Sequence, residues 1–265
     1  MLSLDTIIQI AASHHNQRLE SACNMVARTD AIFRKLGAYT TLGPQEAAML
    51  ETLQGARTFI AAGKELIYEG QQQHAAYILH DGWTCAYKRL RDGARQIVEI
   101  EIPGDFIGLR SLLLRNSDQS VVALTNVEVS KINADRLWEA FRLTPRLIMT
   151  LLWAVSRDEA MVTEHLVCVG KRDAMARTAH FLLELGARME LIGLGSSTTY
   201  RCPLSQSIVA DAVGITAIHL NRVLRHLRES DLLLFRDGVV TFLDRDRLAQ
   251  LTDFDFAYMD HYKPG

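Results

Sequence analysis

Hydrophobic and polar residues follow two different periods along this chain, and the change of period divides it into parts. Between about residues 56 and 132, short apolar or alternating runs are separated by turn residues, above all Gly and Asp-Gly pairs. Many short strands at such regular spacing predict a β-sandwich or a barrel-like roll. The Asp-Gly pair at 92–93 lies between two alternating runs and predicts a tight hairpin. The predicted strands are, in chain order, ARTFIA, ELIYE, AAYILH, WTCAYKRL, RQIVEIE, SVVALT and VEVSKI.

Helical spacing of apolar residues marks the segments on both sides of this roll. Residues 30–52 predict short helices, one of them starting at Pro44, and ADRLWEAF predicts another. One long helix is predicted over 144–169, with an apolar side through Leu147, Leu151, Ala154, Met161 and Leu166. A single small domain would not cover such a side alone, so we expect this helix to pair with a second copy of the chain; a core helix is the alternative. Gly170 is expected to interrupt the helix, and Asp173 to cap the next one.

The stretch VGITAIHLNRVLRHLRES, residues 213–230, predicts a helix with two unlike sides. The side expected to face a core carries Leu220, Val223, Leu224 and Leu227. The opposite side carries Ile218, Asn221, Arg222, Arg225 and Glu229, with His219 at its flank. Thr216 is placed to cap the helix N-terminus. A terminal strand pair, LLLFRDGVVTFL, follows and resembles the wing of a winged helix.

The residues before this helix predict a helix-turn-helix. Ser205 can cap a preceding amphipathic helix, and the small Ala210 lies four residues before Gly214. Leu220 and Val223 lie six and nine residues after that glycine, which is helix-turn-helix spacing. Asn pairs with adenine and Arg with guanine in the major groove, while helix caps lie near phosphates. The outward side therefore predicts DNA binding.

Composition limits how this binding can work. The chain has 265 residues, 48% of them hydrophobic, which is enough for two domains with sizeable cores. A formal net charge of −2 gives no global nucleic-acid signal, so DNA binding must rest on a local patch. Four scattered cysteines indicate neither a zinc site nor a redox pair. No secretion signal or membrane-length apolar run stands out, so we expect a cytoplasmic protein without membrane contact.

Two blocks of sequence resemble the Crp/Fnr family of bacterial transcription regulators, most closely the subgroup common in alphaproteobacteria. They are YILHDGWTCAYKRLRDGARQIVEIEIPGDFIGL and VGITAIHLNRVLRHLRESDLL, and the similarity extends over about residues 30 to 255. The resemblance implies an α+β protein with a cyclic-nucleotide-binding-like β-roll, a long dimerisation helix and a C-terminal winged helix-turn-helix. It also implies a homodimer on a palindromic operator in double-stranded DNA, with RNA polymerase as a further partner.

The same resemblance assigns boundaries and DNA contacts. The expected parts are an N-terminal extension (1–28), a sensor β-roll (29–143), the dimerisation helix (144–169), the DNA-binding domain (170–255) and a tail (256–265). By position, Asn221 and Arg222 fall where family members read bases, and we add their neighbours His219 and Arg225 to this set. Ser205, Gln206 and Thr216 fall near phosphates. Ala217 and Ile218 replace the Arg-Glu pair of the cAMP-responsive branch, so that branch's operator cannot be carried over.

The effector pocket departs from the family pattern. In cAMP-binding members a glutamate holds the ribose and an arginine neutralises the cyclic phosphate. Leu109 and Gln119 take those two places here, and losing charge-assisted bonds to phosphate is costly. Arg110 is a candidate for supplying a charge from a shifted position. We therefore expect a degenerate pocket that does not bind cAMP, formed by Gly104, Gly108, Leu109, Arg110, Ser111, Gln119 and Ser120.

No cofactor or metal is expected. An iron–sulfur centre of the oxygen-sensing branch needs several N-terminal cysteines, and Cys23 is alone there. A haem would need His74, His80 or Cys85 as ligand, and nothing selects one of them. A signal in the β-roll is expected to act on a hinge at Gly170 and Asp173. The alternative to a DNA-binding regulator is a sensor module that acts through protein contacts. An enzyme is the third reading, and no catalytic motif supports it.

Overall fold

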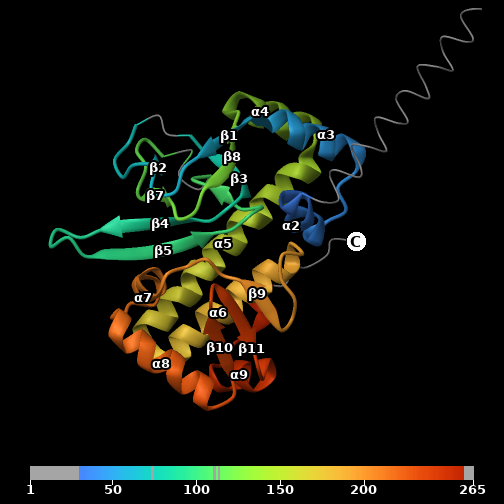
Figure 1. Ribbon diagram of the computed structural model, residues 1–265. Coiled ribbons are helices and arrows are strands. Elements are labelled where there is room, and N and C mark those ends of the chain that lie inside the picture. The colour runs from blue at the N-terminus through green and yellow to red at the C-terminus, as the bar shows by residue number, and fades with distance from the viewer. Residues whose placement is uncertain (1–29, 73–74, 110–111, 113, 260–265) are drawn as a thin grey trace, which may run out of the picture.

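The computed structural model describes residues 30–72, 75–109, 112 and 114–259, and in this part of the chain three sheets alternate with helices (Figure 1). Two four-stranded antiparallel sheets form an N-terminal β-roll. A long helix leads away from the roll to a smaller unit with a three-stranded sheet, which we call the reader domain (residues 174–259). The expected order of β-roll, long helix and winged helix-turn-helix is confirmed.

One sheet of the roll has the strand order β1-β8-β3-β6 and the other has the order β2-β7-β4-β5. Apolar side chains that alternate along the strands meet between the two sheets, among them Ile67, Leu79, Val121 and Val129. Every strand predicted from the sequence is present, and the two-residue strand β6 was missed. The bounds are β1 Gln54–Ile60, β2 Glu65–Ile67, β3 Tyr77–Asp81, β4 Thr84–Arg89, β5 Arg95–Glu101, β6 Phe106–Ile107, β7 Ser120–Ala123 and β8 Val127–Ile132.

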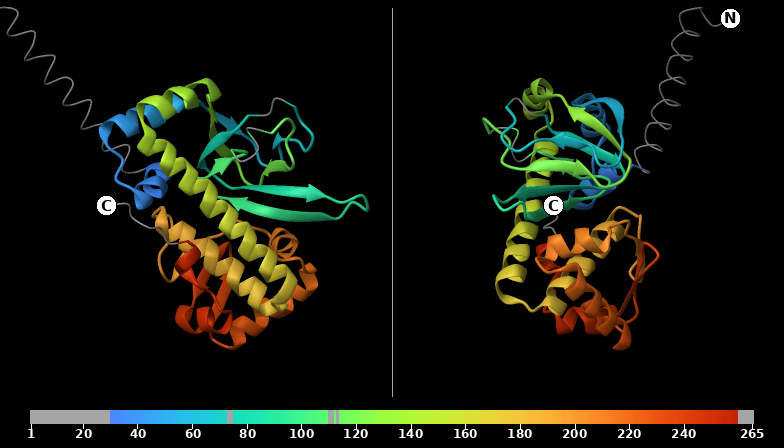
Figure 2. Two further views of the ribbon diagram at one scale, coloured as in Figure 1. Left: turned by 180° about the vertical axis from the view of Figure 1, so that it is seen from behind. Right: turned by 60° about the vertical axis from the view of Figure 1, so that its left-hand side comes forward.

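The hairpin of β4 and β5 turns where the Asp-Gly pair predicts it. Gly93 adopts a left-handed conformation with φ of 88°, which a residue with a side chain rarely adopts. The Asp92 side chain accepts a hydrogen bond from the backbone N–H of Ala94 at 2.9 Å. The two strands extend well beyond the rest of the sheet (Figures 1 and 2).

Three short helices cover the end of the roll: α2 Ala31–Tyr39, α3 Pro44–Leu53 and α4 Ala134–Leu143. Pro44 is the first residue of α3, as predicted, because a proline there loses no helical hydrogen bond. The three helices bury Ile32, Leu36, Leu50 and Ala140 against the first turns of α5.

The long helix α5 spans Pro145–Lys171, and its apolar side corrects one expectation. Leu147, Leu151, Ala154 and Met161 are at most 7% exposed and pack inside their own chain, so they are not available to a second copy. Leu166, assigned to the same side, is instead 72% exposed. The mistake arose because a buried stripe and a dimer seam have similar spacing, and only neighbours distinguish them.

A second correction concerns the end of this helix. Gly170 does not interrupt it, because α5 continues through Lys171. The chain turns at Arg172 and Asp173, and Asp173 caps α6 (Ala174–Leu191) by accepting a hydrogen bond from the N–H of Ala176. The predicted cap at Asp173 is therefore confirmed, whereas the break lies two residues later than expected.

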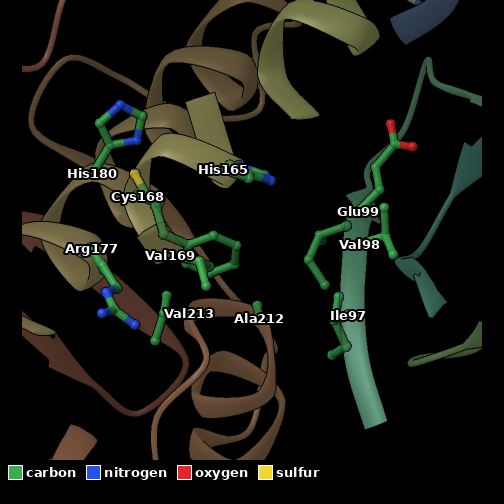
Figure 3. Close-up of a pocket in the computed structure, with 12 residues that line it drawn as sticks. Ile97, Val98, Glu99, His165, Cys168, Val169, Arg177, His180, Ala212 and Val213 are labelled. Atoms are coloured by element: carbon green, nitrogen blue, oxygen red, sulfur yellow. The ribbon is translucent and has the colours of Figure 1, made fainter. Parts of the chain in front are cut away.

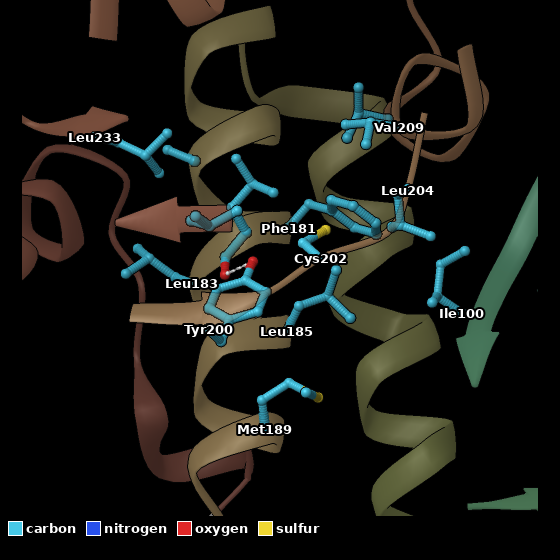
Figure 4. Packing of buried hydrophobic residues seen from close by; sticks show 14 of the residues in the cluster. Ile100, Phe181, Leu183, Leu185, Met189, Tyr200, Cys202, Leu204, Val209 and Leu233 are labelled. Carbon is cyan, nitrogen blue, oxygen red and sulfur yellow. Dashed lines mark hydrogen bonds between the residues drawn. The ribbon is translucent and has the colours of Figure 1, made fainter. Parts of the chain in front are cut away.

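The reader domain packs α6, the sheet β10-β11-β9 and three further helices around one core. Its remaining elements are β9 Thr199–Arg201, α7 Gln206–Val213, α8 Ala217–Glu229, β10 Leu233–Arg236, β11 Val239–Phe242, α9 Arg245–Leu251 and a short 3-10 helix Phe256–Tyr258. Strand β9 lies in a segment that reads as a polar connection, and neither it nor α9 was predicted. Within this core Tyr200 donates a hydrogen bond to the carbonyl of Leu182 (Figure 4).

The core of the reader domain also includes side chains of the β-roll. Two isoleucines of β5, Ile97 and Ile100, belong to the same buried cluster as Phe181 and Leu204, and so does Ile102, the residue after β5 (Figure 4). The β4–β5 hairpin therefore connects the two parts of the chain by packing as well as by sequence.

Candidate nucleic-acid interface

Helices α7 and α8 form the predicted helix-turn-helix, with an angle of 96° between them. Gly214 ends α7 in the left-handed conformation, φ 69° and ψ 40°, and the N–H of Ile215 bonds to the carbonyl of Ala210. Ser205 caps α7 by accepting from the N–H of Ile208, and Thr216 caps α8 by accepting from the N–H of His219. Both caps are where the sequence predicts them.

Helix α8 buries one side and exposes the other. Leu220, Val223 and Leu227 are at most 6% exposed and belong to the core of the reader domain, with Leu224 partly buried beside them. Every member of the predicted outward side is exposed, including the apolar Ile218 at 69%. An exposed helix side that is rich in arginine and has an apolar residue in its first turn is suited to the edges and methyl groups of bases in a major groove.

A groove of about 460 Å³ runs along this exposed side. His219 and Arg222 lie in it together with His226, which sequence reasoning did not single out. His226 follows Arg222 by four residues, so helical spacing alone could have identified it. The complete lining is Met175, Thr216, Ile218, His219, Arg222, Val223 and His226.

Asn221 and Arg225 are exposed on α8 outside this groove. They are four residues apart and so lie one turn from each other on the helix. The side-chain amide of Asn221 donates to the backbone carbonyl of Ala217 at 3.1 Å, which leaves its carbonyl oxygen and second N–H available. The predicted base-reading set thus occupies two adjacent strips of α8.

The predicted phosphate contacts gather at the two helix starts. Ser205 and Thr216 are the N-caps, and Gln206 is the exposed first residue of α7. Free backbone N–H groups at such helix starts favour phosphate oxygens. The polar side chains assigned to phosphates and to bases therefore lie at the two helix starts and on the exposed side of α8.

Two exposed arginines lie in the sheet of the reader domain, beside the turn of its hairpin. The β10–β11 hairpin, which we call the wing, turns at Asp237 and Gly238, both with positive φ. Arg236 and Arg201 flank this turn, since each lies opposite Val239 in the sheet, and both are exposed. The sequence analysis singled out neither of them: Arg201 belongs to the strand that was not predicted, and Arg236 lies in a predicted strand to which no DNA contact was assigned.

The β4–β5 hairpin holds α7 from the side away from α8. Arg95 forms an ion pair with Asp211 of α7, with nitrogen–oxygen distances of 2.6 and 3.1 Å. The Gln96 amide donates to the carbonyls of Asp211 and Ala212 at the end of α7. Ile97 faces Ala212 and Val213 across a gap of only about 20 Å³ (Figure 3). Movement of the hairpin would therefore move the helix-turn-helix.

A second cavity, of about 310 Å³, lies between the β-roll and α5. Gly108, Leu109 and Gln119 of the predicted effector pocket line it, whereas Gly104 and Ser120 do not. Gly104 lies against the backbone of Ala31, and the Ser120 hydroxyl accepts from the N–H of Glu69. Arg110 and Ser111 lie outside the described residues. The other lining residues are Val98, Glu99, Phe106, Val155, Asp158, Glu159 and Val162.

The described wall of this cavity is acidic. Burial raises the pKa of Glu99 well above its ordinary value, and the neighbouring Asp158 raises it further. Burial also raises the pKa of Asp158. Burial acts in the same direction on Asp105 nearby, but the Lys35 ammonium and the Arg188 guanidinium outweigh it and lower that pKa to about 2. No lysine or arginine appears among the described lining residues, so the wall disfavours a phosphate.

Polar side chains also gather where α5 turns into α6. The fully buried carboxylate of Glu184 accepts from His165 of α5 and from the Tyr258 hydroxyl, each at 3.0 Å. His180 lies beside them, packed edge-on against Phe254, and neither ring nitrogen has a hydrogen-bond partner among the described residues. Burial lowers the pKa of His180 to about 4. The expected hinge therefore lies next to a cluster of buried titratable groups.

One arrangement in the roll looks like a hydrolase triad but is sealed. His80 lies 2.8 Å from the Ser130 hydroxyl and 3.5 Å from Asp30. The Ser130 residue is 0% exposed, and the His80 side chain is 2% exposed. A nucleophile needs access to a substrate carbonyl, so this trio connects α2 to the roll and provides no site for acyl transfer.

The side chains considered for metals and haem have other surroundings. Among the described residues, no three His, Cys, Asp or Glu side chains lie close enough together to hold a metal ion. Cys85 is fully buried, and burial raises its pKa to about 12. His74 and Cys23 lie outside the described residues. No single described helix is long and apolar enough to span a membrane, and only the sharply bent α7–α8 pair meets that criterion jointly.

Family models match both parts of the chain. A model of the cyclic nucleotide-binding domain matches residues 57–143, and a model of the Crp-like helix-turn-helix domain matches residues 176–251. These ranges include the cavity-lining strands and the whole α7–α8 pair. The sequence-based resemblance is thereby confirmed for both blocks on which it rested.

Individual regulators of this family are similar to the chain over nearly their whole length. The nitrogen fixation regulation protein FixK of Bradyrhizobium diazoefficiens is 29% identical over 225 residues, 84% of this chain and 92% of that protein. The fumarate and nitrate reduction regulatory protein of Vibrio cholerae is 22% identical over 235 residues, 89% of this chain and 94% of that protein. The solved structure of FixK2 from Bradyrhizobium japonicum has a TM-score of 0.66 and 25% identity, covering 74% of this chain and 96% of that one.

Proposed function

This chain belongs to the Crp/Fnr family of DNA-binding transcription regulators, and we propose that it acts as a homodimer that reads a palindromic operator without a cyclic nucleotide. The observation that carries the proposal is the exposed side of α8, which presents His219, Asn221, Arg222 and Arg225 beside two capped helix starts. In this proposal α8 enters the major groove, and these four side chains contact base edges. Ser205, Gln206 and Thr216, joined by Arg201 of β9 and Arg236 of the wing, bind phosphates.

The exposed face of α5 supports the homodimer. Exposed residues recur along it with alternating steps of four and three, the spacing of a two-stranded coiled coil. Three of them are large and apolar: Met149 at 54%, Leu152 at 55% and Leu166 at 72% exposure. We call this face the seam; it consists of Met149, Leu152, Ser156, Glu159, Thr163, Leu166 and Gly170. Two chains paired in parallel along it would direct both recognition helices to the same duplex, about one turn apart.

Independence from cyclic nucleotides is supported by the cavity. Leu109 and Gln119 line it at the positions where cAMP-binding members carry their glutamate and arginine. The carboxyl groups of Glu99, Asp158 and Glu159 also line it, and no described lining side chain offers a cationic partner to a cyclic phosphate.

We further infer from the proposed DNA interface that the chain is located in the cytoplasm and that RNA polymerase is the partner on which the bound dimer acts.

Selection from randomised duplex DNA tests the proposal. The purified full-length chain is incubated with the pool without any ligand, and the bound fraction is sequenced. We expect an enriched palindrome whose half-sites are about one helical turn apart. A second selection with cAMP should recover the same palindrome at the same enrichment. Enrichment only with cAMP would contradict the ligand-free mechanism.

Salt dependence separates DNA reading from a sensor that acts through protein contacts. Binding to phosphates weakens steeply as salt rises, because bound counterions are released. We therefore expect the affinity for the selected duplex to fall steeply between low and physiological salt. A protein that enriches no sequence and holds duplex DNA no better at low salt than at high salt would not be a DNA reader.

A further inference from the structure

The tip of the β4–β5 hairpin is strongly basic in a chain with a formal net charge of −2. Residues 88–95, which we call the basic tip, read KRLRDGAR and hold four basic residues and one acidic residue. Residues 88–94 are all exposed, and Leu90, which directly follows β4, is 57% exposed. Such a local concentration of charge attracts a polyanion even when the whole protein is nearly neutral.

The four basic side chains of the tip have different partners. Arg95, at the base of the tip, is held by Asp211 of α7. Lys88 lies 3.7 Å from Glu69, which is also exposed, so this ion pair is weak. The Arg89 guanidinium lies over the Tyr87 ring, 5.9 Å from its centroid, and Arg91 makes no ion pair within the described residues. Arg89 and Arg91 are therefore available to bind an external anion.

The position of the tip is fixed relative to the DNA-reading helices. Its base is joined to the end of α7 by the Arg95 ion pair and by the two hydrogen bonds from Gln96. From there the hairpin runs past α7 and projects beyond the reader domain (Figures 1 and 2). A charged element whose base is held this way keeps its place relative to α7, and so relative to the helix-turn-helix.

We propose that the basic tip binds the phosphate backbone of DNA that flanks the operator, with Arg89 and Arg91 as the main contacts. The inference rests on the proposed function, since it requires α8 to hold the operator. DNA that continues past a half-site and bends toward the β-roll reaches the tip, and the added contacts offset the cost of bending. Arginine is suited to this role because its planar guanidinium can bind phosphate through two hydrogen bonds.

Two operator duplexes of different length test the proposal. Both carry the palindrome recovered by selection; the short one ends at the outer edges of the half-sites, and the long one continues for about two helical turns on each side. We expect the unaltered protein to bind the long duplex more tightly. The double variant Arg89→Gln/Arg91→Gln should lose at least about threefold in affinity for the long duplex and nothing for the short one. For the long duplex, the slope of log affinity against log salt concentration should be less steep by about 0.9 for each phosphate that the variant no longer binds.

Matched variants show whether charge at this place is the cause. Arg89→Lys/Arg91→Lys keeps the charge and should retain most of the preference for the long duplex. Arg142→Gln removes an exposed arginine from α4, at the far end of the β-roll, and should change neither affinity (Figure 1). The dimer dissociation constant of each variant, measured by sedimentation, should stay unchanged.

Other outcomes would overturn the proposal in recognisable ways. Equal losses on both duplexes would mean that the tip acts through α7 or inside the operator. No loss on either would leave an acidic protein surface as the partner of the tip. Binding of the short duplex by the unaltered protein preserves the proposed function in both cases, whereas failure to bind either duplex would remove the proposed function itself.

Discussion

At the scale of single residues, α8 shows how one helix serves a core and a ligand. Leu220 and Leu227 are fully buried. Arg222 follows Leu220 by two residues and Arg225 precedes Leu227 by two residues, and both arginines are exposed. The helical period of 3.6 residues alone produces this division, so these placements could be predicted. The buried states of His180 and Glu184 could not, because their neighbours come from α5 and from the residues after α9.

Replacing Arg222 by alanine tests base reading. Arg222 lies in the groove of α8, and we expect Arg222→Ala to lose about 1–3 kcal/mol of binding free energy on the selected operator. Base choice should relax at one position of each half-site, as measured by competition between operator variants. An equal loss on random-sequence DNA would make Arg222 a phosphate contact. Arg228→Ala, on an exposed arginine outside the predicted base-reading set, is the matched control.

His180 should make the folded protein sensitive to acid. Its pKa is about 4 in the folded chain and 6.5 ordinarily, so between these values the unfolded chain binds a proton that the folded chain does not. The free energy of unfolding therefore falls as the pH decreases through this window. Denaturant unfolding at pH 7 and pH 5 measures this fall. We expect the free energy of unfolding to fall by about 2 kcal/mol less in His180→Phe than in the unaltered protein.

A control and an opposing group sharpen this measurement. His226→Gln removes an exposed histidine and should leave the acid sensitivity unchanged. His165 works in the other direction: burial lowers its pKa, but Glu184 outweighs burial and raises it. If stability depends on pH in the same way in His180→Phe and in the unaltered protein, His180 does not cause the loss of stability at acidic pH.

At the scale of elements, α5 separates what a pattern predicts from what it leaves undecided. The sequence predicts a helix of this length at this place, and α5 confirms it within two residues at the C-terminal end and one at the N-terminal end. The side expected to face a second chain is instead buried within its own chain. The most apolar stripe packs on the roll of its own chain, and the seam is a mixed stripe that reads as ordinary surface.

Placing a charge on the seam tests the dimer. Leu166 is 72% exposed and lies on the seam, so Leu166→Glu should leave the chain folded. A parallel dimer would then bury two facing carboxylates, and we expect its dissociation constant to rise at least tenfold, or about 1.4 kcal/mol. Sedimentation at several protein concentrations measures this constant. Leu251→Glu, on an exposed leucine of α9 far from the seam, should have no effect; an unchanged dimer in both would place the interface elsewhere.

At the scale of the whole molecule, the β-roll and the reader domain share one core and one set of buried charges. Ile100 of β5 lies in the reader-domain cluster, and Arg188 of α6 donates to the Ile100 carbonyl and to Asp105 of the roll. Lys35 of α2 completes this group through Asp105. A change in the roll is therefore coupled to the position of α7 and α8 through these contacts and through the β4–β5 hairpin.

Cyclic nucleotide should not act on this coupling. With Glu99, Asp158 and Glu159 in the cavity wall, we expect the affinity for the selected operator to be the same with and without cAMP. Fluorescence anisotropy of a labelled operator measures both affinities. Restoring the family's two residues by Leu109→Glu/Gln119→Arg should still give no response, because the other carboxyl groups remain. A response in the unaltered protein would show that the acidic wall accepts a phosphate.

The sequence by itself determined the order of β-roll, long helix and winged helix-turn-helix, the two helix caps, and which residues of α8 face outward. These features depend on local periodicity, turn glycines and capping side chains, all of which act within a few residues. Only the tertiary structure decided which stripe of α5 is buried, that an acidic wall lines the cavity, and that the β4–β5 hairpin holds α7. Those outcomes depend on which distant segments come into contact, and no local pattern along the chain encodes such contacts.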